Sequence, residues 1–238
     1  MMFKQIMLVA LLAVVTASAK KPCCGPKQFM AGNGGTVGQV DPDSGPQGFF
    51  TYQYGAFDYT NRMFGYNMSV TYPNGTQTNI KLIQKYGQGY QYIILEEFQY
   101  CQKQPVTKPE PINCIPANAT WTSSLFIGGS KGLYADSWTY NFVYPKDPIE
   151  GVIVIQVFES NCYPFGTAFI GDRFQGQTRV PMTSSGGLLN MTIGIPDPDA
   201  WFTVPSFCPK EMNTFKTREE RSAPNLPNLD FFHLPQFY

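Results

Sequence analysis

Aromatic and β-branched residues alternate with polar residues along most of the chain, and Gly, Pro and Asn separate the alternating segments. Successive side chains of a strand point to opposite faces, so a two-residue period predicts strands with one buried face. Residues 48–58 and 62–72 are expected to form a first hairpin, and residues 76–85 and 90–98 a second.

The second half of the chain continues the pattern after a loop rich in Pro and Lys at residues 102–118. Residues 151–158 are nearly continuous Val and Ile, which is typical of a central strand covered on both faces. The remaining strands are expected at residues 125–127, 134–144, 163–174 and 188–195. Eight or nine strands and no amphipathic helix before Cys208 predict one all-β, mainly antiparallel domain, folded as a sandwich or half-open barrel.

The two ends of the chain differ from this domain. Residues 1–19 have the features of a secretory signal peptide: Lys4, an apolar stretch at 6–15, and the small residues Ala17-Ser18-Ala19 before the cleavage point. About ten apolar residues are too few to cross a bilayer, which needs about twenty. We therefore expect a secreted β domain over residues 20–209, with the lysosomal lumen as an alternative destination. Residues 210–238 are expected to form a C-terminal tail that is partly helical or disordered.

The composition narrows the functional classes. Lys and Arg together number 17, as do Asp and Glu, so the formal net charge is zero, and charged residues make up 14% of the chain. A neutral chain without basic runs lacks the electrostatic footprint of a nucleic-acid-binding protein. An aromatic content of 15% argues against disorder, and the single His leaves little basis for a His-ligated metal or a His general base.

The cysteines and the glycosylation motifs agree with secretion. Six cysteines, none in a C-x-x-C pair, predict three disulfides in an oxidising compartment, and the sequence alone leaves fifteen pairings open. Four N-x-[S/T] motifs predict N-glycosylation at Asn67, Asn74, Asn118 and Asn190.

Two patterns could carry catalysis or metal binding. Residues 128–132 fit the G-x-S-x-G nucleophile motif around Ser130, but a strand pattern follows where that motif requires a helix. The one available base, His233, lies in the tail, so we expect a glycine-rich turn and no enzyme. Asp197 and Asp199 offer oxygen ligands for calcium, but the Pro between them is equally typical of a stiff turn.

The aromatic excess, 19 Phe, 14 Tyr and 3 Trp, has two interpretations. It indicates either an aromatic-rich core or a cavity for an apolar ligand, whose walls are typically apolar and aromatic. The alternation selects seven candidate wall residues, although a slip of one residue would turn each to the opposite face. They are Phe50, Tyr52, Tyr54, Tyr90, Tyr92, Ile94 and Trp138.

Short landmark segments follow one another in order between Cys23 and Cys208. They are the Cys-containing start at 22–29, residues 57–62, 118–121, 126–129 with Trp138, 161–164, and 193–198 before 207–208. No single segment is specific, but the collinear set resembles the ependymin-related family of secreted glycoproteins over nearly all of the expected mature chain.

The resemblance implies two stacked antiparallel sheets with a deep hydrophobic pocket, similar to the bacterial carriers of lipoproteins. It also implies an extracellular or lysosomal location, a homodimer, calcium association and a role in cell–matrix adhesion. For the disulfides it implies Cys101 with Cys208, and Cys162 with Cys23 or Cys24. Cys114 departs from the family pattern, and we expect it to bond the remaining member of the vicinal pair.

The leading functional hypothesis is therefore a secreted, N-glycosylated, non-enzymatic protein that binds a lipid or another hydrophobic small molecule between its sheets. The alternative is a calcium-dependent extracellular matrix or adhesion glycoprotein that acts through its surface.

Overall fold

The computed structural model describes residues 20–42, 45–106, 109–144, 149–175 and 177–212. The expected signal peptide, residues 1–19, and the tail from residue 213 lie outside the described residues, and residues 210–212 are not helical. No helix in the described ranges has the length and apolar character needed to cross a membrane.

Strands make up most of the described chain. Their bounds are β1 (Gln28–Asp41), β2 (Gly45–Asp58), β3 (Met63–Thr71), β4 (Gln77–Lys85), β5 (Tyr90–Leu95), β6 (Tyr100–Pro105), β7 (Thr120–Ile127), β8 (Leu133–Tyr144), β9 (Ile149–Phe158), β10 (Pro164–Gln175) and β11 (Thr178–Ile193). Two 3₁₀ turns, η1 (Tyr86–Gln88) and η2 (Glu96–Phe98), flank β5, and α2 (Pro198–Phe202) follows β11.

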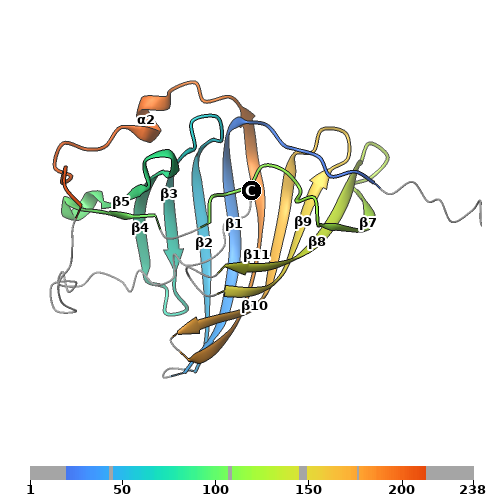
Figure 1. Cartoon of the computed structure of the whole chain (residues 1–238), viewed down its shortest axis with the longest axis horizontal. Coiled ribbons are helices and arrows are strands. Elements are labelled where there is room, and N and C mark those ends of the chain that lie inside the picture. The colour runs from blue at the N-terminus through green and yellow to red at the C-terminus, as the bar shows by residue number, and fades with distance from the viewer. Residues whose placement is uncertain (1–19, 43–44, 107–108, 145–148, 176, 213–238) are drawn as a thin grey trace, which may run out of the picture.

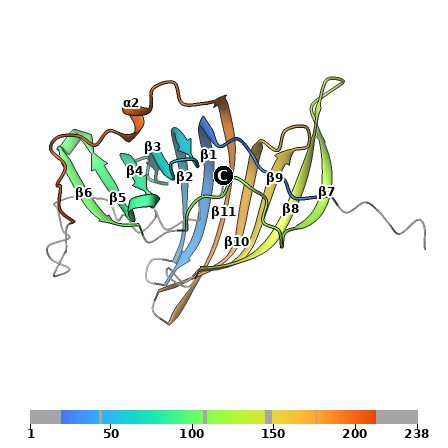
Figure 2. The ribbon, with the colours of Figure 1, turned by 45° about the horizontal axis from the view of Figure 1, so that its top comes forward.

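All the strands belong to one antiparallel sheet in the order β6-β5-β4-β3-β2-β1-β11-β10-β9-β8-β7. The expected all-β antiparallel class is confirmed, but the strands form one continuous curved sheet where we had expected two stacked sheets (Figures 1 and 2). The reason is the pairing of β1 with β11, strands of 14 and 16 residues that hydrogen-bond the two halves together.

Strand β1 was not predicted from the sequence, because its many glycines resemble a loop. The structure explains one of them directly. A Cβ on Gly35 would lie 2.6 Å from the carbonyl oxygen of Ser185 on β11, so a side chain there would force the two strands apart. The glycine is thus a requirement of close strand approach at the centre of the sheet.

Two apolar clusters cover the same face of this sheet. The first includes Phe57 and Val37, and the second includes Ile153 and Phe169. Val37 and Phe169 both lie opposite Ser184 of β11, and residues opposite each other in an antiparallel sheet share a face. The sheet curves around the β6–β7 connection on this side, which is therefore its concave face (Figure 2).

The β6–β7 connection ties the two clusters together. The hydroxyl of Tyr59, which packs on the first cluster, donates to the carbonyl of Ile112, which packs on the second, at 3.5 Å. The hydroxyl of Tyr86 donates to the carbonyl of Pro109 at 2.9 Å. Arg62 forms an ion pair with Glu110 at 2.6 Å, so the connection is held to the turn between β2 and β3 as well.

Three disulfides hold the segments outside the sheet. They join Cys23 to Cys162, Cys24 to Cys114, and Cys101 to Cys208. The family resemblance implied the Cys101–Cys208 pair and left Cys162 with either member of the vicinal pair, and Cys114 bonds the remaining member as we expected. The first two link the segment before β1 to the β9–β10 turn and to the β6–β7 connection. The third holds the segment after α2 against β6.

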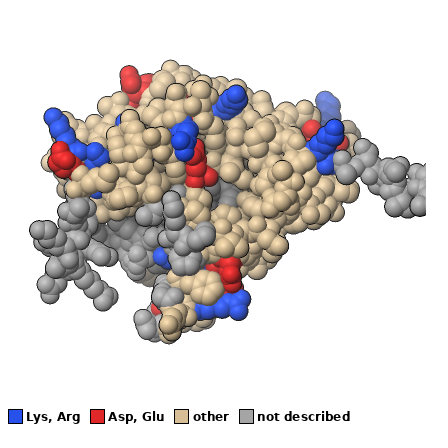
Figure 3. All heavy atoms as spheres, in the orientation of Figure 1, with Lys and Arg blue, Asp and Glu red and all other residues tan. Residues whose placement is uncertain are grey.

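Strand β9 differs from its prediction. Ile149, Ile153 and Ile155 are buried on the concave face, but Val152 on the other face is 42% exposed. The apolar residues of β9 therefore lie alternately on the concave face, where they are buried, and on the convex face, where they are at least partly exposed. On the side of the molecule seen in Figures 1 and 3, across which the β6–β7 connection runs, charged side chains gather in a few small groups separated by uncharged surface.

Candidate functional site

The convex face of the sheet carries a groove, here called the outer groove, with a volume of about 430 Å³. It crosses β1, β11, β10 and β9 and is lined by Gly34, Gly35, Thr36, Val154, Gln156, Thr167, Ala168, Ser185, Gly186 and Gly187. Its floor is backbone, because Gly34 lies opposite Gly187, which lies opposite Gly166, on three neighbouring strands. The hollow exists because three adjacent strands present no side chain at the same level.

The next row of outward residues is also small. Thr36, Ser185, Ala168 and Val154 lie opposite one another across four strands. The hydroxyls of Thr36 and Ser185 are 3.1 Å apart and hydrogen-bonded to each other. At the β9 end, the side-chain amide of Gln156 donates to the hydroxyl of Ser137 at 3.5 Å. The polar side chains among the lining residues are therefore those of Thr36, Thr167, Ser185 and Gln156, and the remaining polar groups are backbone.

Large apolar side chains surround these small residues. Phe50 and Tyr52 on β2 are 68% and 48% exposed, and Leu189, Ile170 and Val152 are also exposed. The Tyr52 ring lies across β1, with its hydroxyl oxygen 3.1 Å from the place where a Cβ of Gly32 would be. An aromatic wall thus stands at one end of a floor made of backbone and small side chains.

The surface around the groove is uncharged. Three consecutive rows of outward residues from β2 to β8 contain no charged residue. They are Tyr52, Gly34, Gly187, Gly166, Gln156 and Ser137; Phe50, Thr36, Ser185, Ala168, Val154 and Thr139; and Gly48, Gly38, Thr183, Ile170, Val152 and Asn141. Removing a charged ligand group from water here would have no compensating ion pair, so the surface favours neutral and apolar groups.

The seven wall residues expected from the sequence do not form one pocket. Phe50 and Tyr52 border the outer groove, whereas Tyr54, on the same face, packs against Trp201 with ring centroids 5.6 Å apart. Trp138 lies on the concave face, in the second cluster, and is 2% exposed.

The other three wall residues are on the convex face but are covered. Tyr90, Tyr92 and Ile94 pack under the segment after α2, against Val204 and Cys208. Lys103 extends over the Tyr90 ring at 4.3 Å from its centroid and donates to the carbonyl of Lys210 at 2.6 Å. Sequence reasoning missed the glycines of the groove floor. The search selected large aromatic side chains, and glycine has no side chain to select.

The other residues singled out in the sequence have these positions. All four glycosylation-motif residues, Asn67, Asn74, Asn118 and Asn190, are exposed, and glycosylation there stays a prediction. The turn at 128–132 joins β7 to β8, so a strand follows Ser130, and His233 lies outside the described residues.

The calcium candidates have a structural role. The Asp197 carboxylate accepts a hydrogen bond from the backbone N–H of Ala200 at 3.3 Å and caps the N-terminus of α2, while Asp199 lies in its first turn. Within the described ranges, no three His, Cys, Asp or Glu side chains gather as metal ligands would. Calcium association stays a prediction.

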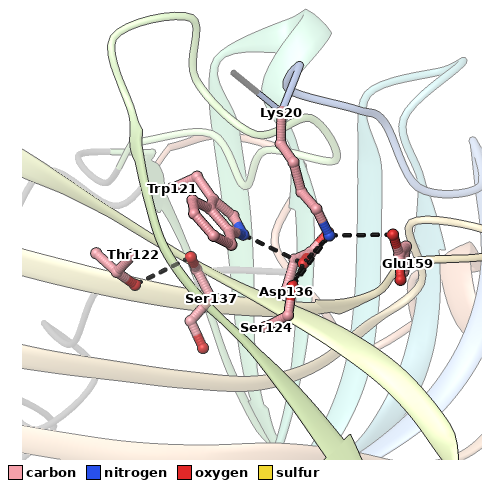
Figure 4. A network of polar contacts seen from close by, with 7 residues as sticks. All are labelled: Lys20, Trp121, Thr122, Ser124, Asp136, Ser137 and Glu159. Atoms are coloured by element: carbon pink, nitrogen blue, oxygen red, sulfur yellow. Dashed lines mark hydrogen bonds and ion pairs between the residues drawn. The ribbon is translucent and has the colours of Figure 1, made fainter. Parts of the chain in front are cut away.

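A charged network anchors the first described residue (Figure 4). The ammonium group of Lys20 bonds to Asp136 at 2.6 Å and to Glu159 at 3.0 Å. Asp136 also accepts hydrogen bonds from Ser124 at 2.7 Å and from Trp121 at 3.2 Å. Burial alone would raise the pKa of Asp136, but these bonds and the charge of Lys20 lower it below its usual value.

Comparisons with known proteins identify relatives of the chain. The sequence model of the ependymin family matches residues 74–208. Development-specific protein LVN1.2 of Lytechinus variegatus is 39% identical over 162 residues, which cover 66% of this chain and 85% of LVN1.2.

Solved structures are more distant. A LolA superfamily protein from Nitrosomonas europaea aligns with a TM-score of 0.29 and 9% identity over 73% of this chain and 89% of its own. A β-barrel-like protein of a domain of unknown function from Brucella abortus aligns with a TM-score of 0.26 and 8% identity, over 72% and 99% of the two chains.

Proposed function

The chain belongs to the ependymin family, and we propose that it is a secreted, N-glycosylated protein that binds a lipid or another apolar small molecule in the outer groove. The observation that carries this proposal is an uncharged hollow with an exposed aromatic border, on a face where an apolar strand such as β9 is left uncovered.

The size of the groove suits such a ligand. A volume of about 430 Å³ is within the range of about 300–1,000 Å³ found for small-molecule sites. A ligand that removes about 300 Å² of apolar surface from water gains about 7.5 kcal/mol before the cost of its immobilisation. Affinities of micromolar or weaker are therefore expected.

The proposal is for binding and not for catalysis. The side chains that line the outer groove supply hydroxyls, one amide and apolar groups. A Ser or Thr hydroxyl becomes an effective nucleophile only when an adjacent base activates it, and none of the groove's lining residues carries an imidazole, carboxyl, thiol or amine group.

Titration with a fluorescent fatty acid tests the proposal. Ser185 is exposed on the floor of the groove, so Ser185→Phe fills the hollow without entering a cluster. We expect it to weaken binding at least tenfold. The control is Asn79→Phe. Asn79 is an exposed residue of β4 that lies on the convex face of the sheet, as Ser185 does, but outside the groove. Equal binding by both variants and the wild type would refute the assignment of the site.

The same protein samples also test the expected homodimer and the alternative function in calcium-dependent adhesion. Light scattering on the wild type and on Ser185→Phe measures whether a second copy covers the convex face, as a homodimer would. A calcium titration followed by thermal unfolding tests the adhesion alternative, which requires calcium to raise the melting temperature or to drive assembly.

A further inference from the structure

The hairpin formed by β7 and β8 extends beyond the rest of the sheet. Ala135 of β8 pairs with Phe158 at the end of β9, and residues 125–134 continue past this point. In this segment, here called the hairpin tip, Phe126 pairs with Tyr134 and Ile127 with Leu133. The carbonyl of Tyr134 also accepts a hydrogen bond from the backbone N–H of Glu159 at 3.0 Å, which marks the lower limit of the free segment. Figure 2 shows β7 and β8 rising above the neighbouring strands.

The hairpin tip exposes large apolar side chains on both of its faces. Phe126 and Tyr134 are 54% and 61% exposed, with their ring centroids 5.0 Å apart. Leu125, Ile127 and Leu133 are exposed on the opposite face, since neighbouring strand residues alternate. Five large apolar side chains are therefore exposed at one projecting point, on both faces of the hairpin, and exposed apolar surface gathered in this way marks an interaction site.

The hairpin tip carries a single charged side chain, which is positive. Its sequence contains Lys131 and no Asp or Glu. The nearest carboxylates along the hairpin and the adjoining β9–β10 turn, Asp136 and Glu159, lie at the base and both bond to Lys20, which leaves one net negative charge there. The tip therefore combines apolar side chains with one cation, a combination that matches acyl chains beneath anionic headgroups.

The narrow shape of the hairpin tip also favours a lipid bilayer over a protein as its binding partner. A protein partner would have to enclose both faces of a narrow hairpin, whereas a membrane interface surrounds whatever enters it. Tyr and other aromatic side chains concentrate at that interface. β7 is an edge strand, so its outer backbone groups need water or headgroups, which limits entry to about 5–10 Å.

We propose that the hairpin tip docks the protein on lipid bilayers that contain anionic lipid. The exposed apolar side chains of the tip, such as Phe126 and Leu133, enter the boundary between the lipid headgroups and the acyl chains. Lys131 contacts lipid phosphates. The expected glycans leave this contact free, because none of the four motifs lies in the tip and Asn74 is at the opposite end of the strands. The docking does not require the outer groove.

The test is sedimentation of the full secreted protein with vesicles of phosphatidylcholine and phosphatidylserine. We expect the double variant Phe126→Ser, Leu133→Ser to lower the partition coefficient at least tenfold. The matched control is Val40→Ser, Val143→Ser, which removes two side chains that are 47% and 67% exposed on the convex face, away from the tip and outside the groove. It should bind vesicles as the wild type does.

Lys131→Glu separates the two components of the contact. It should weaken binding to vesicles with phosphatidylserine severalfold and leave binding to pure phosphatidylcholine nearly unchanged. The proposal is overturned if the wild type does not sediment with vesicles, or if the tip and control variants lose binding equally. A tip variant that changes the oligomeric mass instead would assign the tip to contacts between copies. The fatty-acid titration, in which tip variants should behave as wild type, tests the groove independently.

Discussion

Lys20 and Lys21 are adjacent residues of the same type in different environments. Lys20 bonds two carboxylates, whereas Lys21 is exposed. We expect Lys20→Gln to lower the free energy of unfolding by about 1 kcal/mol, a value at the low end for charged hydrogen bonds because Lys20 retains solvent contact. For a domain of this size that is a fall in melting temperature of about 2–4 °C. Lys21→Gln is the control and should change little in the same thermal scan.

The pH dependence of this contribution follows from both pKa shifts. The pKa of Asp136 is lowered in the fold, so its contribution is full above the ordinary value of about 4 and is lost as pH falls through the folded value. The pKa of Lys20 is raised, chiefly by its hydrogen bond to Asp136, so its contribution is lost only as pH rises through that higher value. The melting-temperature difference between wild type and Lys20→Gln should therefore be largest between about pH 5 and 10. A difference that persists unchanged at about pH 2 would contradict this account.

Two glycines of β2 offer a second matched comparison. A Cβ on Gly55 would lie 2.3 Å from the Cβ of Tyr66 and 2.4 Å from the carbonyl oxygen of Gly65, whereas one on Gly48 would meet only the carbonyl oxygen of Val37 at 3.8 Å. Since backbone cannot move aside cheaply, we expect Gly55→Ala to destabilise the fold by about 2–3 kcal/mol. Gly48→Ala should be nearly neutral by chemical denaturation. Similar losses for both would show that the strands are spaced more loosely than described.

At the scale of elements, the Cys101–Cys208 disulfide keeps the segment after α2 over Tyr92 and Ile94. Replacing both cysteines with Ser should lower the free energy of unfolding by about 2–4 kcal/mol. It should also increase the fluorescence of an apolar dye, because the released segment uncovers β5. Loss of stability without dye binding would mean that the segment stays in place unaided.

The predictable elements are those with an alternating pattern. The first hairpin, expected at residues 48–58 and 62–72, corresponds to β2 and β3, and the second corresponds to β4 and β5. In contrast, β1 and the first part of β11 were missed. Their pairing depends on glycines such as Gly35, whose role appears only when the partner strand is in place. Strand β6 was missed as well, because residues 102–105 were assigned to the loop rich in Pro and Lys. Local pattern thus predicted the two hairpins and failed for the strands that join the halves.

The candidate site was only partly predictable for the same reason. Phe50 and Tyr52 were selected by alternation and border the outer groove, but its floor combines residues about 150 positions apart in the chain. Trp138 was assigned to the same wall but faces the other side of the sheet. In a strand a side chain's face depends on register, and register across β7, β8 and β9 is not evident from spacing.

For the whole molecule, the question is whether the two clusters unfold as one unit. Their boundary is crossed by β1 and β11, which pair with each other along most of their length. β1 carries Val37 of the first cluster and β11 carries Met182 of the second, so neither cluster keeps its sheet when the other melts. The hydrogen bond from Tyr59 to Ile112 joins them again on the concave side.

We therefore expect one cooperative thermal transition, with equal calorimetric and van't Hoff enthalpies. Ile80→Ala in the first cluster and Ile153→Ala in the second remove the same groups from buried sites. Each should cost about 2–5 kcal/mol and shift the entire transition. If instead one variant splits the transition and leaves the other cluster melting at the wild-type temperature, the glycine-lined centre of the sheet separates two independently folding halves. The outer groove, which spans that centre, would then open whenever either half unfolds.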